Sequence, residues 1–534
     1  MIPKKETMTV EFKSDRKGLS DRLLAEEVVA MANSEGGTIY IGVEDDGTIT
    51  GAQKEHLDKE GVRAVIANLT FPSVFVQSDI IEENGLPVVK LEVPVSTSIV
   101  ATSSGKTLQR RLRFDGAPEM KPLYPYEFES RKSYLGQVDP SRVSVFPYRD
   151  DLIDESSIAK AKDAIELNEN SDKTLLGLEN MEFLSSMEAI FLDASGEPRI
   201  TLAGLLLFGT SDAIKRLCPS ASYAFQRLES GKVRQNDETS LNVLDAFEAF
   251  ERFVETFDFE DEFLYKMRRI GVRYFEKDAL REAFANAIAH RDYSILDPVR
   301  ATYDGAGLTI FNPGRLIRGL SPNGLIVASP RGRNPLLSTS LKRLGLCERT
   351  GRGVDRIYAS FARYGKRWPR YSLSDENGVT LYLSRSRIDE DFARFVLDLN
   401  PRLDPVPLIC LSYVRSASEA DANEIAAAMS IPKEIVASEM DALLERGAVE
   451  EEDGVYRLRG ADIKKAPTKI GKEEAFGLVL ALAKRQKEGI SSNDVQSLLG
   501  IDGDKAHYLL KQMVAKGMLR SEGRLKYTKY FPAE

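Results

Sequence analysis

The sequence predicts an α/β multidomain protein that ends in two winged helix-turn-helix domains. Three observations lead to this fold class. The chain has 534 residues, more than one hydrophobic core usually organises, so three or four domains are expected. Short strands and amphipathic helices share the chain up to about residue 387. Residues 388–460 and 461–534 then each follow the order helix, turn, helix and β-hairpin.

Composition excludes several classes of protein. The chain is 42% hydrophobic and 29% charged, without a long low-complexity tract, so large disordered regions are not expected. No uncharged apolar run approaches the ~20 residues needed to span a bilayer. The first residues, MIPKKETMTVEFK, lack the apolar core of a secretory signal. We therefore expect a cytoplasmic protein without a membrane partner.

Cysteine and histidine are too few and too scattered for a zinc site. The three residues of each type are Cys218, Cys347, Cys410, His56, His290 and His507. Their spacing excludes a zinc finger, and a disulfide framework is not expected in the cytosol. Any metal ion must be held by carboxylates.

Residues 1–130 are expected to form one domain. In Thr9–Lys13 the alternation places Val10 and Phe12 on one strand face and Glu11 and Lys13 on the other. The further elements expected are a helix over Asp21–Asn33, ended by Gly36 and Gly37, a buried strand over Thr38–Val43, and strands near Val88–Val93 and Thr107–Phe114.

Acidic residues near the first two strands suggest metal chemistry. Many nucleases hold Mg²⁺ or Mn²⁺ with carboxylates, while a lysine steadies the attacking water or the phosphate. The catalytic candidates are Glu6, Glu11, Lys13, Glu44 and Asp45, and the metal ligands would be Glu6, Glu11 and Asp45. From spacing alone, a solvated strand face on which Glu11 and Lys13 pair weakly with neighbours is the favoured interpretation.

The first segment also resembles a known family. Glu11–Lys13, then Glu26–Gly47 and Gly51, are similar to the α+β Schlafen/AlbA-type nucleic-acid-binding domain. The resemblance implies that Glu6, Glu11 and an acid in the turn Glu44–Asp46 match the metal ligands of Schlafen RNA endonucleases. Many bacterial relatives are instead described as transcriptional regulators. A Schlafen core needs two such lobes and this chain shows one, so a homodimer or higher homo-oligomer is expected.

A basic cluster follows in the same domain. Arg110, Arg111 and Arg113, with Phe114, Tyr124 and Tyr126 nearby, would supply phosphate contacts with aromatic stacking. The alternative is a hairpin with a solvated basic face. Beside an AlbA-type domain, contact with DNA or RNA is the prediction.

Residues 131–195 are expected to be a helical connector, with helices over Glu155–Leu167 and Leu175–Met187. The next domain spans residues 196–387 and begins with the core run Ile200–Gly209. In the predicted helix Arg281–Tyr293, Glu282, Asn286 and His290 recur every four residues and share one face. The carboxylate and the amide can hold Mg²⁺ and a phosphate oxygen together. The alternative is a polar stripe that packs against another helix.

This second segment resembles the divergent GHKL-type ATP-binding module, of the RecG-like C-terminal kind, an α/β sandwich. The resemblance rests on Glu282–Tyr293, Leu308–Gly314, Arg333–Pro335 and Gly345–Ile357. It implies that Glu282 is the helix acid, Asn286 the Mg²⁺ ligand, Asn312 and Gly314 the adenine-reading turn, and Gly351 and Gly353 the glycines under the phosphates, with His290 on the same helix face. The family's adenine reader is an aspartate, and Asn312 accepts a hydrogen bond more weakly. ATP binding is predicted, whereas hydrolysis is not, because the lid is not recognisable.

Net charge is −9, which argues against a generally basic surface, but the two C-terminal domains differ in sign. Residues 415–460 hold 5 basic and 11 acidic residues, and residues 461–534 hold 14 basic and 9 acidic ones. The acidic winged helix should repel DNA and the basic one can meet phosphates. Its candidate contacts are Lys505, Lys511, Arg520, Arg524 and Lys526. The alternative is that both domains serve packing or dimerisation.

The sequence thus predicts an ATP-binding transcriptional regulator that contacts DNA through the basic winged helix. The alternative is a Mg²⁺- or Mn²⁺-dependent nuclease that acts on RNA or single-stranded DNA, in the manner of a phage-defence enzyme. A third interpretation is a scaffold whose two ancestral sites are inactive. Whether the chain is an enzyme, as a nuclease or a weak ATPase, is left open by the residues alone.

Overall fold

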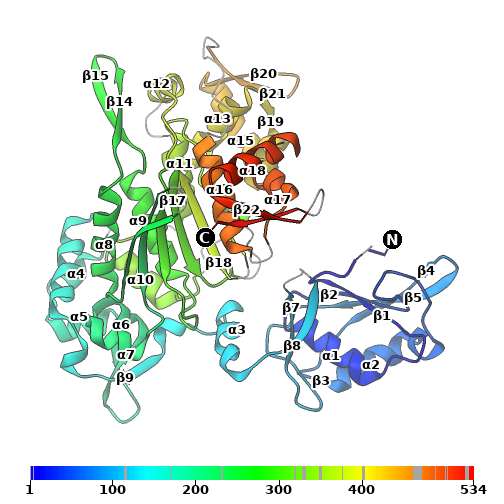
Figure 1. Ribbon diagram of the computed structural model, residues 1–534. Helices are drawn as coiled ribbons and strands as arrows, with labels where there is room; N and C mark the ends of the chain where they lie inside the picture. The colour runs from blue at the N-terminus through cyan, green and yellow to red at the C-terminus, as the bar shows by residue number, and fades with distance from the viewer. Residues whose placement is uncertain are drawn as a thin grey trace. The chain divides into compact units, whose positions relative to one another are not determined.

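The computed structural model divides into two compact units, Met1–Val138 and Asp139–Glu534, and each is described by itself (Figure 1). The structure describes residues 2–3, 5–113, 117–169, 171–229, 232–317, 320, 322–327, 332–347, 352–375, 377–399, 403–460, 472–486, 489–499, 501, 503–523 and 528–533. Within these residues, no helix is both long and apolar enough to cross a lipid bilayer.

The first unit is built on a four-stranded sheet with the order β1-β2-β5-β4. The strands are β1 (Val10–Lys13), β2 (Gly37–Ile41), β4 (Gln77–Glu83) and β5 (Leu86–Val93), and only β1 and β2 are parallel. Helices α1 (Asp21–Ala32) and α2 (Lys59–Leu69) bury their apolar faces in a shared core with β2 and β5. The expected strand, helix and strand are therefore confirmed to within a few residues.

Two short antiparallel pairs complete this unit, β3 (Thr70–Phe71) with β6 (Ala101–Thr102) and β7 (Leu108–Leu112) with β8 (Pro118–Pro122). The end of α1 holds β7 in place. The Asn33 amide donates to the carbonyl oxygens of Val100 and Leu108 at 2.8 and 2.9 Å, and Ser34 Oγ accepts from the Arg110 N–H at 2.7 Å. Arg110 is thereby fixed beside α1. Helix α3 (Phe128–Tyr134) follows.

The second unit opens with a three-stranded antiparallel sheet in the order β10-β11-β9. Its strands are β9 (Ser144–Pro147), β10 (Ile190–Leu192) and β11 (Pro198–Thr201), and its helices are α4 (Glu155–Leu167), α5 (Asn180–Ser186), α6 (Leu202–Phe208) and α7 (Ser211–Leu217). Every residue of α6 is buried, which confirms the apolar run as core. The expected helix over Leu175–Met187 is interrupted, because a short 3₁₀ turn (Lys173–Leu175) precedes the separate helix α5.

A five-stranded central sheet follows, in the order β13-β12-β16-β17-β18. The strands are β12 (Tyr223–Glu229), β13 (Lys232–Thr239), β16 (Val299–Tyr303), β17 (Gly307–Pro313) and β18 (Gly378–Ser384). Helices α8 (Val243–Glu255), α9 (Lys277–Ala289) and α11 (Gly353–Ala362) pack together beside this sheet. Phe250 of α8 and Phe284 of α9 stack with ring centroids 4.3 Å apart. A hairpin, β14 (Glu260–Tyr265) and β15 (Arg268–Arg273), projects from this part (Figure 1).

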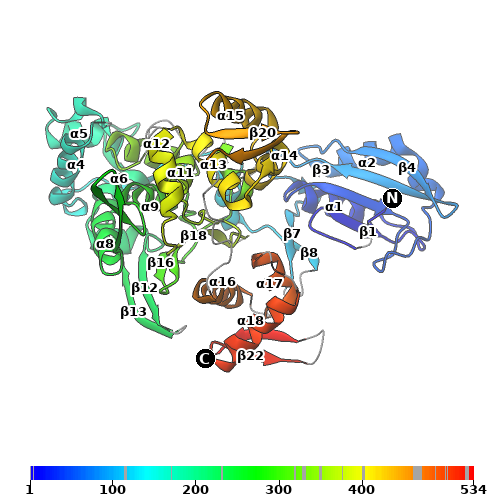
Figure 2. The ribbon, with the colours of Figure 1, turned by 90° about the horizontal axis from the view of Figure 1, so that it is seen from above.

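The C-terminal elements follow in the order that the sequence predicts. The acidic segment (residues 403–460) holds α13 (Pro405–Ala417), β19 (Ala420–Asp421), α14 (Ala422–Met429), α15 (Lys433–Glu445), β20 (Val449–Glu452) and β21 (Val455–Leu458), after α12 (Glu390–Leu399). The basic segment (residues 472–533) holds α16 (Lys472–Arg485), α17 (Ser492–Leu499), α18 (Gly503–Ala515), β22 (Leu519–Glu522) and β23 (Lys529–Pro532) (Figure 2). The acidic segment shares the hydrophobic core of the central sheet, whereas the basic segment has a second core, which Leu373 and, from β18, Tyr382 also join.

Candidate functional site

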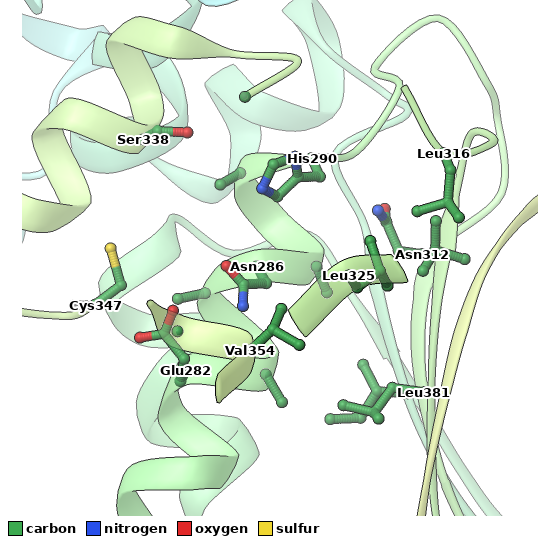
Figure 3. A pocket seen from close by; sticks show the side chains of 18 of the residues that line it. Glu282, Asn286, His290, Asn312, Leu316, Leu325, Ser338, Cys347, Val354 and Leu381 are labelled. Carbon is green, nitrogen blue, oxygen red and sulfur yellow. The ribbon is translucent and has the colours of Figure 1, made fainter. Parts of the chain in front are cut away.

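A cavity of about 210 Å³ lies against the inner face of the central sheet, between α9, α10 (Pro335–Arg343) and α11 (Figure 3). Its apolar walls come from alanines of α9, from Ile310 and Leu381 of the sheet, and from the segment after β17. The polar side chains along it are Glu282, Asn286, His290, Asn312, Arg315, Ser338 and Lys342. The cavity therefore gathers most of the predicted ATP-site residues from segments far apart in the chain.

Glu282 and Asn286 lie one turn apart on α9 and both face the cavity (Figure 3). The expected extension of this helix to Tyr293 is wrong, because α9 ends at Ala289 and His290 is its C-cap. The His290 N–H still donates to the Asn286 carbonyl oxygen at 3.0 Å. The three predicted residues thus share one wall, although the third stands at the helix end.

His290 is held as a neutral imidazole at physiological pH. Burial lowers the pKa of His290 to about 4, and the positive charges of Arg333 and Lys342 lower it further in the same direction. A neutral ring offers one N–H donor and one acceptor nitrogen. The residue can therefore bind a ligand by hydrogen bonds and does not bring positive charge to the cavity.

Asn312 lies on β17 and is 4% exposed. In the orientation that satisfies its hydrogen bonds, the side-chain nitrogen donates to the Ala287 carbonyl oxygen of α9 at 3.0 Å. The side-chain oxygen of Asn312 then remains to accept a hydrogen bond. Figure 3 shows Asn312 with Leu316 and Leu325 on one side of the cavity and Glu282 with Cys347 on the other.

Gly314 and the residues after α9 shape the turn behind Asn312. Gly314 has φ +103°, and a Cβ atom there would come within 2.6 Å of the Asp292 side chain. Asp292 in turn accepts a hydrogen bond from buried Arg333 at 3.2 Å, and the Asn334 amide donates to the carbonyl oxygens of Ala289 and Arg291. Gly314 and this network are therefore structural, because they lock the turn against the end of α9.

Gly353 begins α11 and touches α9 directly. A Cβ atom on Gly353 would lie 1.7 Å from Glu282 Oε1, so only glycine allows this approach. Gly351, the other predicted glycine, lies outside the described residues. The contact brings the N-terminus of α11, the positive end of the helix dipole, beside the Glu282 carboxylate.

Two of the predicted nuclease residues, Glu11 and Lys13, belong to an ionic cluster with Glu27 and Arg110. The ammonium of Lys13 pairs with Glu11 and, at 3.0 Å, with Glu27 of α1. The Arg110 guanidinium donates to the second Glu11 oxygen at 2.5 Å and to the Thr7 carbonyl oxygen at 2.9 Å. Two carboxylates thus face two cations, and both oxygens of Glu11 have cationic partners. Arg110, predicted as a phosphate contact, is a buried member of this cluster.

Glu6 and Glu44, two of the other predicted acids, have hydrogen-bond partners of their own. Glu6 accepts a hydrogen bond from the Phe12 N–H at 3.0 Å, and burial raises its pKa. Glu44 accepts from Thr50 at 2.7 Å, which lowers its pKa, and holds its own turn together. Across the described residues, no three carboxylate, histidine or cysteine side chains, Asp45 included, are grouped so as to hold a metal ion.

The remaining basic candidates differ in their surroundings. Arg111 pairs with Glu127, and Arg113 lies 3.4 Å from Glu119. On the basic segment, Arg520 pairs with Glu522. Lys505 and Lys511 are exposed on α18, with Tyr508 between them at 66% exposure. Arg524 and Lys526 lie outside the described residues.

Three side chains at these sites escape prediction from the sequence. Glu27 lies within α1, and only the packing of α1 against β1 shows that its carboxylate pairs with Lys13. Lys342 lies in α10, a segment without a recognisable pattern. Tyr508 could have been found, because it lies three residues from both Lys505 and Lys511 and so shares their helix face.

Three segments of the chain match family models. Residues 6–113 match "Schlafen, AlbA_2", residues 139–224 match "Domain of unknown function (DUF8451)", and residues 306–383 match "Putative ATP-dependent DNA helicase recG C-terminal". No curated protein matches the chain.

A solved structure shares the overall fold. The crystal structure of the DIP2311 protein from Corynebacterium diphtheriae superposes with a TM-score of 0.52 at 21% sequence identity. The match covers 85% of this chain and 92% of that one. Taken with the family models, these observations identify the chain as one that joins a Schlafen AlbA_2 domain to an ATPase-like domain of the recG C-terminal type.

Proposed function

We propose that this protein is an ATP-binding regulator that contacts DNA through its basic C-terminal segment. The observation that carries the proposal is the convergence of Glu282, Asn286, Asn312 and Gly353 on one cavity. Nucleotide binding is also what the ATPase-like domain suggests. The regulatory role rests on the combination of this cavity with a separate basic segment.

The cavity fits an adenine nucleotide. Its right-hand side in Figure 3 joins Asn312 to the apolar side chains Leu316, Leu325 and Leu381, which suits a flat aromatic base. The Asn312 side-chain oxygen is left to accept a hydrogen bond from a ligand, because the side-chain nitrogen already donates to the Ala287 carbonyl oxygen. An exocyclic amino group, as in adenine, satisfies this acceptor, whereas the carbonyl oxygen of guanine would repel it. The asparagine thus performs the role of the usual aspartate without its charge.

The opposite side of the cavity suits phosphates and a divalent cation. Asn286 and Glu282 offer hard oxygen ligands one helical turn apart, and bound Mg²⁺ would neutralise part of the phosphate charge there. The N-terminus of α11 begins at Gly353, beside Glu282. Backbone N–H groups at a helix N-terminus favour anions.

The basic segment supports contact with DNA. We infer that α17, α18 and the β22–β23 hairpin form a winged helix whose second helix enters the major groove. One face of α18 exposes Lys505, Tyr508 and Lys511. The acidic segment has the same order of elements, but Glu450, Glu451 and Glu452 occupy strand β20 and would repel phosphates. It is therefore assigned to packing against the central sheet.

The alternative of a metal-dependent nuclease gains no support from the first unit. A metal ion at Glu11 would have to displace Lys13 or Arg110, and a buried charge left without its partner is costly. The donor set thus does not fit Mg²⁺ or Mn²⁺, and we derive no catalytic step there. The first unit is proposed to bind nucleic acid through its surface.

The experiment is DNA binding by the full chain, measured by fluorescence anisotropy on random duplex pools with and without ATP. We expect Lys505→Met with Lys511→Met to weaken binding, while Lys215→Met, an exposed lysine of α7, does not. Equal binding by both variants would refute the assignment of α18. Metal-dependent cleavage of RNA or single-stranded DNA that Glu11→Gln abolishes would instead establish the nuclease. The homodimer stays a prediction, and sedimentation of the same sample measures it.

A further inference from the structure

Helix α10 stands in the segment between the Asn312 turn and Gly353, where the sequence shows no recognisable lid. Contacts with Asp139, Ser141 and Asp172 fix the orientation of α10. Leu336 N–H donates to the Asp139 carboxylate at 2.7 Å, Leu337 N–H donates to Ser141 Oγ at 3.1 Å, and Arg343 pairs with Asp172 at 3.0 Å. With Leu337 and Leu341 fully buried, the helix cannot rotate freely about its axis.

This anchoring turns two polar side chains of α10 toward the cavity. Ser338 and Lys342 are four residues apart, so they lie on the same face one turn from each other, and both line the cavity. Both are partly buried. Among the described residues, neither the Lys342 ammonium nor the Ser338 hydroxyl has a hydrogen-bond or ion-pair partner.

The Lys342 ammonium lies at the cavity without a counter-ion among the described residues. A charge that is partly removed from water is more favourable when an opposite charge pairs with it. The neighbouring Arg343, for comparison, is paired with Asp172. Lys342 and His290 both line the cavity, and the charge of Lys342 lowers the pKa of His290. A ligand that brings negative charge would satisfy Lys342, Ser338 and the His290 ring together.

We propose that α10 supplies the phosphate-binding cation of this cavity, with Lys342 and Ser338 contacting the polyphosphate of the bound nucleotide. The proposal rests on the adenine-nucleotide site and names the residues that recognise its charged end. Ser338 lies on the same side of the cavity as Glu282, away from Asn312 (Figure 3). The base would thus be read from β17 and the phosphates from α10.

The experiment is calorimetric titration of the full chain with ATP, ADP, AMP and adenosine in the presence of Mg²⁺. The variants are Lys342→Met, Lys342→Arg, Ser338→Ala and, as the matched control, Lys215→Met. We expect Lys342→Met to weaken ATP binding by about tenfold or more, since a charge-assisted hydrogen bond is lost. Adenosine should bind this variant and the parent protein equally. Lys342→Arg should restore part of the affinity, and the control should change nothing.

The outcomes separate this inference from the proposed function. If the parent protein binds none of the four compounds, the nucleotide site itself is refuted. If it binds adenosine as tightly as ATP, the site holds a nucleoside and the inference about phosphates fails. If ATP is preferred but Lys342→Met keeps that preference, the phosphate contact lies elsewhere and the inference also fails. Melting curves of each variant exclude misfolding as the cause of a loss.

Discussion

Gly353 lies against the carboxylate of Glu282, so close that a Cβ atom on the glycine would stand 1.7 Å from Oε1. The contact joins the first residue of α11 to the middle of α9 across one wall of the cavity. It explains why Gly353 and the helix acid Glu282, 71 positions apart in the chain, line one cavity. The two positions can be tested as a pair.

Gly353→Ala should reduce nucleotide affinity and stability together. The added methyl group has to displace either the Glu282 side chain or the start of α11, at a cost of about 1–3 kcal/mol for overpacking. Gly177→Ala is the matched control, because a Cβ atom there meets nothing within 4 Å. Thermal melting and calorimetric titration measure the two effects. Unchanged binding by Gly353→Ala would show that the contact is not maintained in solution.

Arg110→Met should destabilise the first unit far more than Arg111→Met. Arg110 is buried and paired with Glu11, so its loss leaves a buried carboxylate short of a partner, which costs about 3–5 kcal/mol. Arg111 is half exposed and pairs with Glu127, and such surface pairs contribute about 0–1 kcal/mol. Urea unfolding monitored by circular dichroism compares the two variants. Similar losses would mean that the ionic cluster is solvated.

His290 should make the second unit less stable as the pH falls. Its folded pKa of about 4 lies below the ordinary value of 6.5, so protonation favours the unfolded chain. The stability it contributes is present above pH 6.5 and is lost between pH 6.5 and 4. Because the ring is partly exposed, we expect a loss on the order of 2 kcal/mol. The positive charges of Arg333 and Lys342 oppose the protonation of His290.

Comparison with His290→Asn isolates this effect, since the acid titration of other groups is common to both proteins. Melting temperatures are measured between pH 7 and pH 4.5. The difference between parent and variant should shrink or reverse toward low pH. A constant difference would indicate an imidazole with an ordinary pKa.

Trp368, the single tryptophan of the chain, should report nucleotide binding. Its ring packs edge-on against Tyr358 of α11 at 6.4 Å, and its indole N–H donates to Ser412 of α13 at 3.0 Å. Because α11 begins at the cavity, a ligand that moves this helix changes the surroundings of the indole. ATP should therefore shift the intrinsic fluorescence, and Ser412→Ala should alter the emission before ATP is added. Binding by calorimetry without any spectral change would contradict this coupling.

Tyr508→Ala and Lys511→Met should weaken DNA binding in different ways. A lysine that contacts a phosphate adds close to one unit to the slope of log affinity against log salt, so its loss reduces the slope by about 1. Tyr508 carries no charge, and its loss should lower affinity at every salt concentration without altering the slope. Anisotropy titrations at several salt concentrations distinguish the two. Equal slopes for Lys511→Met and the parent would remove Lys511 from the phosphate contacts.

Local pattern was sufficient where a segment's structure depends on its own residues. The helix over Asp21–Asn33 follows from its apolar stripe, and the strand over Thr38–Val43 follows from its run of apolar residues. The shared helix face of Glu282 and Asn286 follows from their spacing, and their proposed place in an ATP site follows from the resemblance to the GHKL-type module. The predicted end of α9 was too late by a few residues. The carbonyl oxygens of Ala289 and Arg291 accept hydrogen bonds from the Asn334 amide, a contact with a distant residue that helix propensity does not reveal.

The sequence by itself determined the order of most helices and strands and the two oppositely charged segments, since these depend on neighbours within about ten residues. The tertiary structure alone decided which charges meet. Arg110 resembled a free phosphate contact until the fold placed it 2.5 Å from Glu11, and Lys342 carried no signal until α10 turned it into the cavity. The physical reason is that a charge acts through distance and burial in three dimensions, and neither quantity can be read from spacing along the chain.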